Sequence, residues 1–169
     1  PKKALKMFQE ALKRNPNNSH ALANEGLIHL LEGRPGTCVK RSKEALKIDP
    51  NLRSAKHNMG LGQLMLRQWE DGWKNFHDTL GVKHREKRDY GFPDWDGKSP
   101  GKVLVYGEQG VGDEIMYASC LHDLMKTNEV VFDCDARLEK TFSRSFNIPV
   151  CGTRFHTETP LLDNHTDIK

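Results

Sequence analysis

EALKRNPN at residues 10–17 and EALKIDPN at residues 44–51 are nearly the same segment, written twice at a distance of 34 positions. The spacing extends beyond these segments, because Asn24 recurs as Asn58 and Gly26 recurs as Gly60. A fixed period of this size is typical of repeat proteins, in which each unit packs against its neighbours. The first part of the chain is therefore expected to be a stack of similar units.

Each unit is expected to contain two helices. The periodicity of apolar residues predicts helices over residues 20–32, 37–48, 54–67 and 70–80, and one more over residues 1–15. Pro16 and Pro50 mark the ends of units, because proline disfavours the helical conformation of the residue before it. Since residues 1–15 supply one helix of a pair, we expect the sequence to begin inside a longer array.

Small residues recur where paired helices would have to approach closely. They are Gly26, Cys38, Ala45, Gly60 and Gly72. This arrangement, with its period of 34, resembles the tetratricopeptide repeat (TPR) family. The resemblance implies an α-helical TPR solenoid over residues 1–82, whose function is to hold another polypeptide.

The resemblance also implies which residues contact that polypeptide. In TPR proteins the first helix of each pair lines a groove, and Asn24, Leu27, Asn58 and Leu61 stand at such positions. An asparagine amide both donates and accepts, so it can bind the backbone of an extended peptide whatever its side chains. This placement resembles the repeats of O-GlcNAc transferase. The alternative is that Asn24 and Asn58 only cap or bridge neighbouring helices.

The composition changes after the repeats. Residues 1–90 carry a net charge of +8 and residues 91–169 a net charge of −5, so a basic module precedes an acidic one. Residues 83–101 are expected to be a linker, because they combine the basic run KHREKR with a segment rich in glycine and proline. A basic run is typically a solvated face, and no row of aromatic residues supports a nucleic-acid partner.

The last part, residues 102–169, has an α/β pattern. KVLVY at residues 102–106 and VVF at residues 130–132 predict buried strands, and helices are expected over residues 115–125 and 137–146. Strands that alternate with helices indicate a parallel sheet. Ligands of such sheets bind at the carboxyl ends of the strands, where the loop with Gly107, Gly110 and Gly112 would lie.

Two common phosphate-binding patterns do not fit this loop. A P-loop counted from Gly107 requires lysine where Asp113 stands, and an acid there would repel phosphate. The dinucleotide-binding pattern requires a third glycine where Ile115 stands. The three glycines therefore serve as a turn or belong to another kind of site.

Residues 93–121, PDWDGKSPGKVLVYGEQGVGDEIMYASCL, resemble the opening of transferase-like domains that follow TPR arrays and are similar to heptosyltransferases. The resemblance implies the start of a Rossmann-like segment of a GT-B glycosyltransferase. It implies that Asp113 is the base that activates the acceptor hydroxyl. The alternative is that Asp113 only caps the helix that follows. A parent glycosyltransferase, with its repeats selecting the acceptor, is thus a second function beside peptide binding.

The sequence gives no sign of other cofactors. A nucleotide sugar would be the donor of a glycosyltransferase parent, but the chain itself is expected to hold no cofactor. The four cysteines form no CxxC pair, and His156 and His165 lack metal-ligand spacing, so we expect no metal. No run of about 18 apolar residues predicts a membrane span. We therefore expect a cytoplasmic protein.

Overall fold

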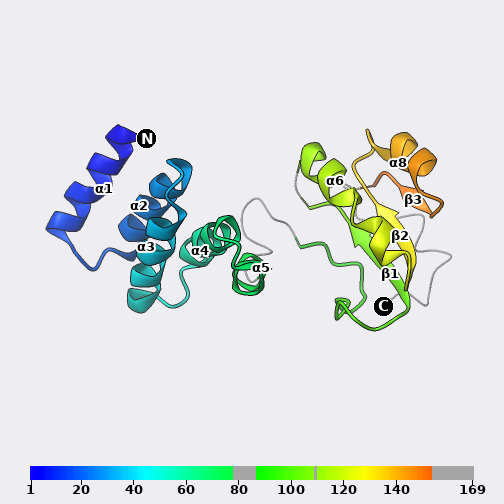
Figure 1. Cartoon of the computed structure of the whole chain (residues 1–169), viewed down its shortest axis with the longest axis horizontal. Helices are drawn as coiled ribbons and strands as arrows, with labels where there is room; N and C mark the ends of the chain where they lie inside the picture. Colours follow the sequence, from blue (N-terminus) through cyan, green and yellow to red (C-terminus); the bar gives the residue numbers. More distant parts are fainter. Residues whose placement is uncertain (78–86, 109, 154–169) are drawn as a thin grey trace. The chain divides into compact units, whose positions relative to one another are not determined.

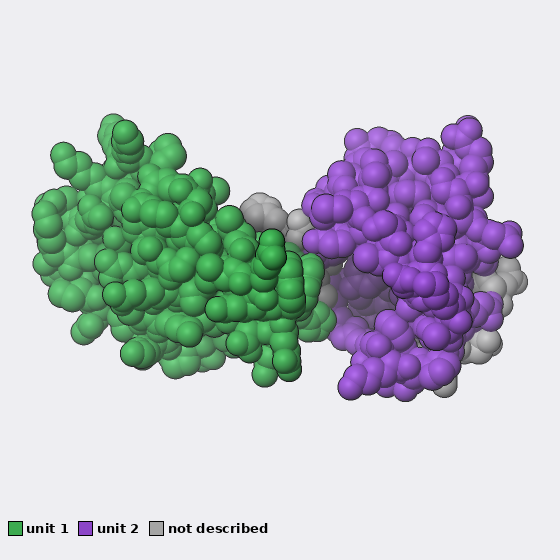
Figure 2. Space-filling view, viewed as in Figure 1, with its two compact units in different colours: residues 1–83 green, residues 84–169 purple. Residues whose placement is uncertain are grey.

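The structure is a computed structural model that describes residues 1–77, 87–108 and 110–153 (Figure 1). The chain divides into two compact units, residues 1–83 and residues 84–169 (Figure 2). The first unit is helical, and the second contains a small parallel sheet. This is the order of fold classes that the sequence predicts. His156 and His165, and the predicted end of the fifth helix at residues 78–80, lie outside the described residues.

Five helices form the described part of unit 1, and each packs against the next along the chain (Figure 1). They are α1 (Lys2–Arg14), α2 (Ser19–Leu31), α3 (Pro35–Ile48), α4 (Arg53–Met65) and α5 (Trp69–His77). All five predicted helices are confirmed, with bounds that differ by a few residues. Asn18 caps α2 by accepting a hydrogen bond from the backbone N–H of Ala21.

The 34-residue period is also visible in the backbone. α1 and α3 both end at an extended residue, Asn15 with φ −138° and Asp49 with φ −130°. Each of these side chains accepts a hydrogen bond from the backbone N–H two residues later, at 3.1 Å from Asn17 and 3.0 Å from Asn51. Two stretches of related sequence thus make the same turn.

Small residues occupy the centre of unit 1. Cys38, Ala23, Ala45 and Ala55 are completely buried, since side chains of this size let the helices approach one another. A Cβ atom added to Gly60 would lie 2.8 Å from the backbone nitrogen of Phe76 in α5. The prediction that small residues mark close contacts between paired helices is confirmed at Cys38, Ala45 and Gly60.

Unit 2 is built on three parallel strands in the order β1-β2-β3. They are β1 (Lys102–Tyr106), β2 (Glu129–Asp133) and β3 (Val150–Cys151). Helices α6 (Val111–Ala118) and α7 (Leu121–Leu124) lie between β1 and β2, and α8 (Glu139–Ser145) precedes β3. β1 has the predicted bounds, whereas β3 was not predicted.

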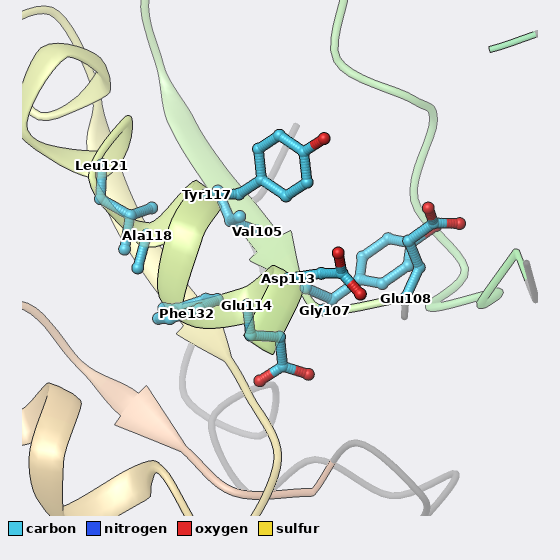
Figure 3. Close-up of a pocket in the computed structure, with 10 residues that line it drawn as sticks. Val105, Gly107, Glu108, Asp113, Glu114, Tyr117, Ala118, Leu121 and Phe132 are labelled. Carbon is cyan, nitrogen blue, oxygen red and sulfur yellow. The ribbon is translucent and has the colours of Figure 1, made fainter. Parts of the chain in front are cut away.

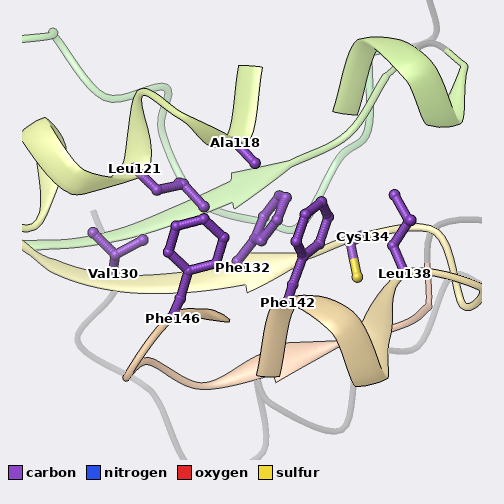
Figure 4. Packing of buried hydrophobic residues seen from close by; sticks show 8 residues of the cluster. All are labelled: Ala118, Leu121, Val130, Phe132, Cys134, Leu138, Phe142 and Phe146. Carbon is purple, nitrogen blue, oxygen red and sulfur yellow. The ribbon is translucent and has the colours of Figure 1, made fainter. Parts of the chain in front are cut away.

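The core of unit 2 lies between β2 and the helices (Figure 4). Aromatic rings dominate it, with Phe142 at 5.2 Å from Phe132 and 5.8 Å from Phe146 between ring centroids. Its buried members are Ala118, Leu121, Val130, Phe132, Cys134, Leu138, Phe142 and Phe146. Burial of these side chains is the main source of stability for the unit.

One predicted helix of unit 2 is interrupted in the structure. The sequence predicts a continuous helix over residues 115–125, whereas α6 begins at Val111 and ends at Ala118, and α7 is a separate short turn. The Ser119 hydroxyl donates a hydrogen bond to the carbonyl of Met116 at the point of interruption. Such local bonding by serine competes with regular helix geometry.

No helix among residues 1–77, 87–108 and 110–153 is long and apolar enough to cross a membrane.

Candidate functional site

The four predicted peptide-contacting residues lie on α2 and α4, at equivalent positions of the two 34-residue repeats of unit 1. Asn24, Leu27 and Leu61 are partly exposed, whereas Asn58 is buried. Residues three and four apart on a helix share one face, so Asn24 and Leu27 present a common surface, as do Asn58 and Leu61. The two helices also pack against each other.

Asn58 makes contacts within the protein. Its amide Nδ2 donates a hydrogen bond of 3.0 Å to the carbonyl oxygen of Ala23 in α2. Its backbone carbonyl oxygen accepts a hydrogen bond of 3.3 Å from the Cys38 thiol in α3. Asn58 thus bridges neighbouring helices, as the alternative interpretation expected. The Asn24 side chain, by contrast, makes no hydrogen bond within the described part of the chain.

Two residues of the same face were missed by the sequence analysis. Leu31 is 69% exposed and Met65 is 56% exposed, although both are large and apolar. They follow Leu27 and Leu61 by four residues and are themselves 34 positions apart. That spacing is the signal that could have identified them. Together with Asn24, Leu27 and Leu61 they form what we call the α2/α4 face.

The Lys, Arg, Asp and Glu residues of α2 and α4 that are not buried are all positively charged. Glu25 is the single acidic residue in the two helices; it is 2% exposed and pairs with Arg41 at 3.0 Å. Arg53 and Lys56 supply positive charge on α4, and neither is buried. Lys56 lies on the side of α4 opposite to Met65, because nine residues correspond to about two and a half turns of helix.

The second candidate site is the loop between β1 and α6. Gly107 continues β1 and donates a backbone hydrogen bond of 3.1 Å to the carbonyl of Asp133. Gly110 is the N-cap of α6, and Asp113 stands in the first turn. The Asp113 carboxylate accepts a hydrogen bond of 3.2 Å from the Gly110 N–H, so it does cap the helix. The cap leaves further lone pairs of the carboxylate for other partners.

A cavity of about 200 Å³ opens beside this loop (Figure 3). Asp113 and Tyr117 lie on the same side of α6, whereas Glu114 is directed to the other side (Figure 3). The cavity is lined by Val105, Tyr106, Gly107, Glu108, Asp113, Glu114, Tyr117, Ala118, Leu121 and Phe132. The predicted residues Asp113 and Gly107 are thus brought together, while Gly110 and Gly112 shape the start of the helix.

Glycine is required at position 107, because the Glu114 side chain leaves no room there for a Cβ atom. The buried Glu114 carboxylate accepts a hydrogen bond of 2.8 Å from the Asp135 N–H, and a Cβ atom on Gly107 would collide with it. We expect Gly107→Ala to destabilise unit 2 by about 1–3 kcal/mol, because the carboxylate must move and loses this bond. Gly112→Ala meets nothing within 4 Å and should be neutral or stabilising. Equal melting temperatures for the two variants would contradict this account of the loop.

Asp133, at the carboxyl end of β2, was also missed. It is completely buried, and its Oδ2 accepts hydrogen bonds from Arg88 at 2.6 Å, Tyr90 at 2.7 Å and the Thr153 hydroxyl at 2.9 Å. Burial, reinforced by the bond to Asp133, raises the pKa of the Tyr90 hydroxyl well above its usual value. Arg88 and Tyr90 come from the expected linker, so this part of it packs on unit 2.

Comparison of the chain with protein-family models and with curated proteins gave no match.

Proposed function

We propose that unit 1 is a TPR-type module that binds an extended polypeptide segment across the α2/α4 face. The observation that carries the proposal is the recurrence, at 34 residues, of partly or largely exposed aliphatic side chains on that face: Leu27 and Leu31 on α2, Leu61 and Met65 on α4. Covering an exposed large apolar side chain with a partner lowers the free energy, because apolar surface is removed from water.

The asparagines have different roles in this proposal. Asn24 has an amide available to the backbone of the bound segment, since it makes no hydrogen bond within the described residues. Asn58 is a positioning residue, because its amide holds α4 against the Ala23 carbonyl of α2.

Alanine variants of the two asparagines test this division. We expect Asn24→Ala to leave the stability unchanged and to weaken binding of a peptide, selected from a random display library against the full chain, by about fivefold. Asn58→Ala should cost about 1–2 kcal/mol of stability, because a buried hydrogen bond is lost. Isothermal titration and urea denaturation measure the two effects. If Asn24→Ala binds the peptide as the unchanged chain does, Asn24 has no part in binding.

A second function is sugar transfer by a longer parent protein, with the Asp113 carboxylate as the base for an acceptor hydroxyl. The position of Asp113 favours it, since this residue lines a cavity at the carboxyl end of a parallel strand, where α/β enzymes bind their ligands. The resemblance of residues 93–121 to heptosyltransferase-like domains points the same way. The nucleotide sugar would then be bound by parts outside this sequence.

The Asp113→Asn variant distinguishes a catalytic base from a residue that only caps the helix. It retains an oxygen that can accept the Gly110 N–H but has no carboxylate that takes up a proton. If Asp113 is the base, we expect Asp113→Asn to lower turnover in the parent protein by about 100-fold or more, with a melting temperature close to that of the unchanged protein. Full transfer activity in this variant would remove Asp113 from the chemistry.

A further inference from the structure

Two tryptophans of α5 lie about half in solvent. Trp69 is 56% exposed and Trp73 is 45% exposed, although both side chains are large and aromatic. They are four residues apart, so they lie on one face of the helix. The ring of Trp73 packs edge-on against Phe76, at 5.9 Å between the ring centroids. α5 therefore presents an ordered aromatic surface to solvent.

The 34-residue period shows what covers the same face in the preceding repeat. Trp69 and Trp73 are equivalent to Pro35 and Val39 of α3. Val39 is only 8% exposed, and a Cβ atom added to Gly62 of α4 would lie 2.9 Å from its Cγ2 and 3.2 Å from the carbonyl oxygen of Pro35. This face of α3 is thus covered by a neighbouring helix. The tryptophan face of α5 is a helix-packing surface of the same kind.

We propose that a second copy of the chain covers this face, with the two α5 helices packed antiparallel around a twofold axis at Trp73. Trp73 is the middle residue of α5, which runs from Trp69 to His77. Around such an axis Trp73 meets its own symmetry mate, and Trp69 of each copy meets His77 of the other. These three residues follow one another at four-residue spacing, so they make one continuous seam. The inference is independent of peptide binding by the α2/α4 face and of sugar transfer.

The charges of α5 favour its own copy as the partner. Glu70 and Asp71 lie in the first turn of α5, whereas Lys74 lies in its last turn, and all three are exposed. In an antiparallel pair the acidic turn of each helix lies beside the basic turn of the other, so both signs are matched. A partner that carries charge of one sign would match only half of α5. Such self-complementarity is what a twofold interface requires.

The dimer is expected to be weak, because two half-exposed tryptophans in each copy offer less area than the roughly 1,200–2,000 Å² buried by stable complexes. We expect a dissociation constant of about 10–100 μM for the full chain, measured by sedimentation equilibrium over a concentration series. Trp73→Ala should weaken the dimer at least about tenfold, because it truncates an aromatic residue at the centre of the interface. Ile115→Ala is the matched control, because Ile115 is 55% exposed on α6 and should not affect association.

An exchange of charges tests the arrangement without truncating a ring. Glu70→Lys makes the rim of the seam positive in both copies and Lys74→Glu makes it negative, so each variant alone should dimerise about fivefold more weakly. A mixture of the two should form a heterodimer with an affinity within about twofold of that of the unchanged chain, because opposite signs then meet. Glu10→Lys and Lys13→Glu alter an exposed ion pair of α1 and should leave association unchanged.

Circular dichroism of each variant shows whether it is folded. If Trp73→Ala unfolds α5, the charge variants decide, because the side chains that they change are exposed. The proposal is overturned if the unchanged chain is a monomer up to about 1 mM, or if Trp73→Ala and Ile115→Ala associate equally. It is also overturned if mixing the charge variants does not restore association. A mixture that binds far more tightly than the unchanged chain would indicate parallel helices and overturn the antiparallel arrangement.

Discussion

Replacement of Asp133 by alanine is expected to lower the free energy of unfolding of unit 2 by about 3–5 kcal/mol. The carboxylate is completely buried and accepts hydrogen bonds from Arg88, Tyr90, the Thr153 hydroxyl and the Thr153 backbone. Its removal leaves the Arg88 guanidinium, 16% exposed, without its carboxylate partner at 2.6 Å. An uncompensated charge of this kind is far more costly than a lost surface ion pair.

Two further variants make the Asp133 experiment specific. Asp133→Asn should cost less than Asp133→Ala, because the amide oxygen can still accept from the Tyr90 hydroxyl. Asp123→Ala removes an exposed carboxylate that pairs with Lys126 and should leave the stability almost unchanged, because solvent screens such a pair. Amide hydrogen exchange of β1 and β2, measured by mass spectrometry during urea unfolding, reports on unit 2 alone. Equal protection in Asp133→Ala and Asp123→Ala would show that the hydrogen bonds of Asp133 do not stabilise unit 2.

The second large effect is expected at Gly60. A Cβ atom there would lie 2.8 Å from the nitrogen of Phe76, 3.1 Å from the carbonyl oxygen of Gly72 and 3.2 Å from the carbonyl carbon of Asn75. All three are backbone atoms of α5, so no side-chain rotation relieves the contact. We expect Gly60→Ala to destabilise unit 1 by about 2–3 kcal/mol, because α4 and α5 must separate.

Two other helical glycines provide graded controls. A Cβ atom on Gly26 would meet Arg41 Cβ and the Cys38 carbonyl oxygen at 3.3 Å, so Gly26→Ala should cost about 1 kcal/mol. One on Gly36, in the first turn of α3, would meet nothing within 4 Å. Gly36→Ala should therefore stabilise the chain by up to about 1 kcal/mol through helix propensity. Thermal denaturation followed by circular dichroism should rank the variants in this order, and any other rank contradicts the packing described for unit 1.

The helices of unit 1 could be predicted because their signals are local and repeated. Pro16 and Pro50 follow the last helical turns directly, and the asparagine and aspartate that precede them make the same hydrogen-bonded turn. β1 was equally clear, since KVLVY is a short β-branched apolar run beside a glycine loop. By contrast, β3 contains two residues, too few to give a periodic pattern.

The parts of the sites that were missed depend on contacts between distant residues. Arg88 and Asp133 are 45 positions apart, and Asn58 and Ala23 are 35 apart, so no window of sequence contains either pair. Asn58 therefore looked equivalent to Asn24, although its amide bonds within the protein. Leu31 and Met65 could have been found from the period, but apolar residues at helical spacing are usually assigned to the core. Their exposure is evident only from the fold.

The most direct test of peptide binding by unit 1 is a chemical-shift map of the isotope-labelled chain during titration with a display-selected peptide. Our account predicts that the largest changes lie on the α2/α4 face, at Asn24, Leu27, Leu31, Leu61 and Met65, and that they saturate together at one dissociation constant. Changes confined to the opposite helices α3 and α5, or to unit 2, would contradict it. The account would also be contradicted if the full chain selected no peptide whose binding is blocked by an excess of the same peptide free in solution.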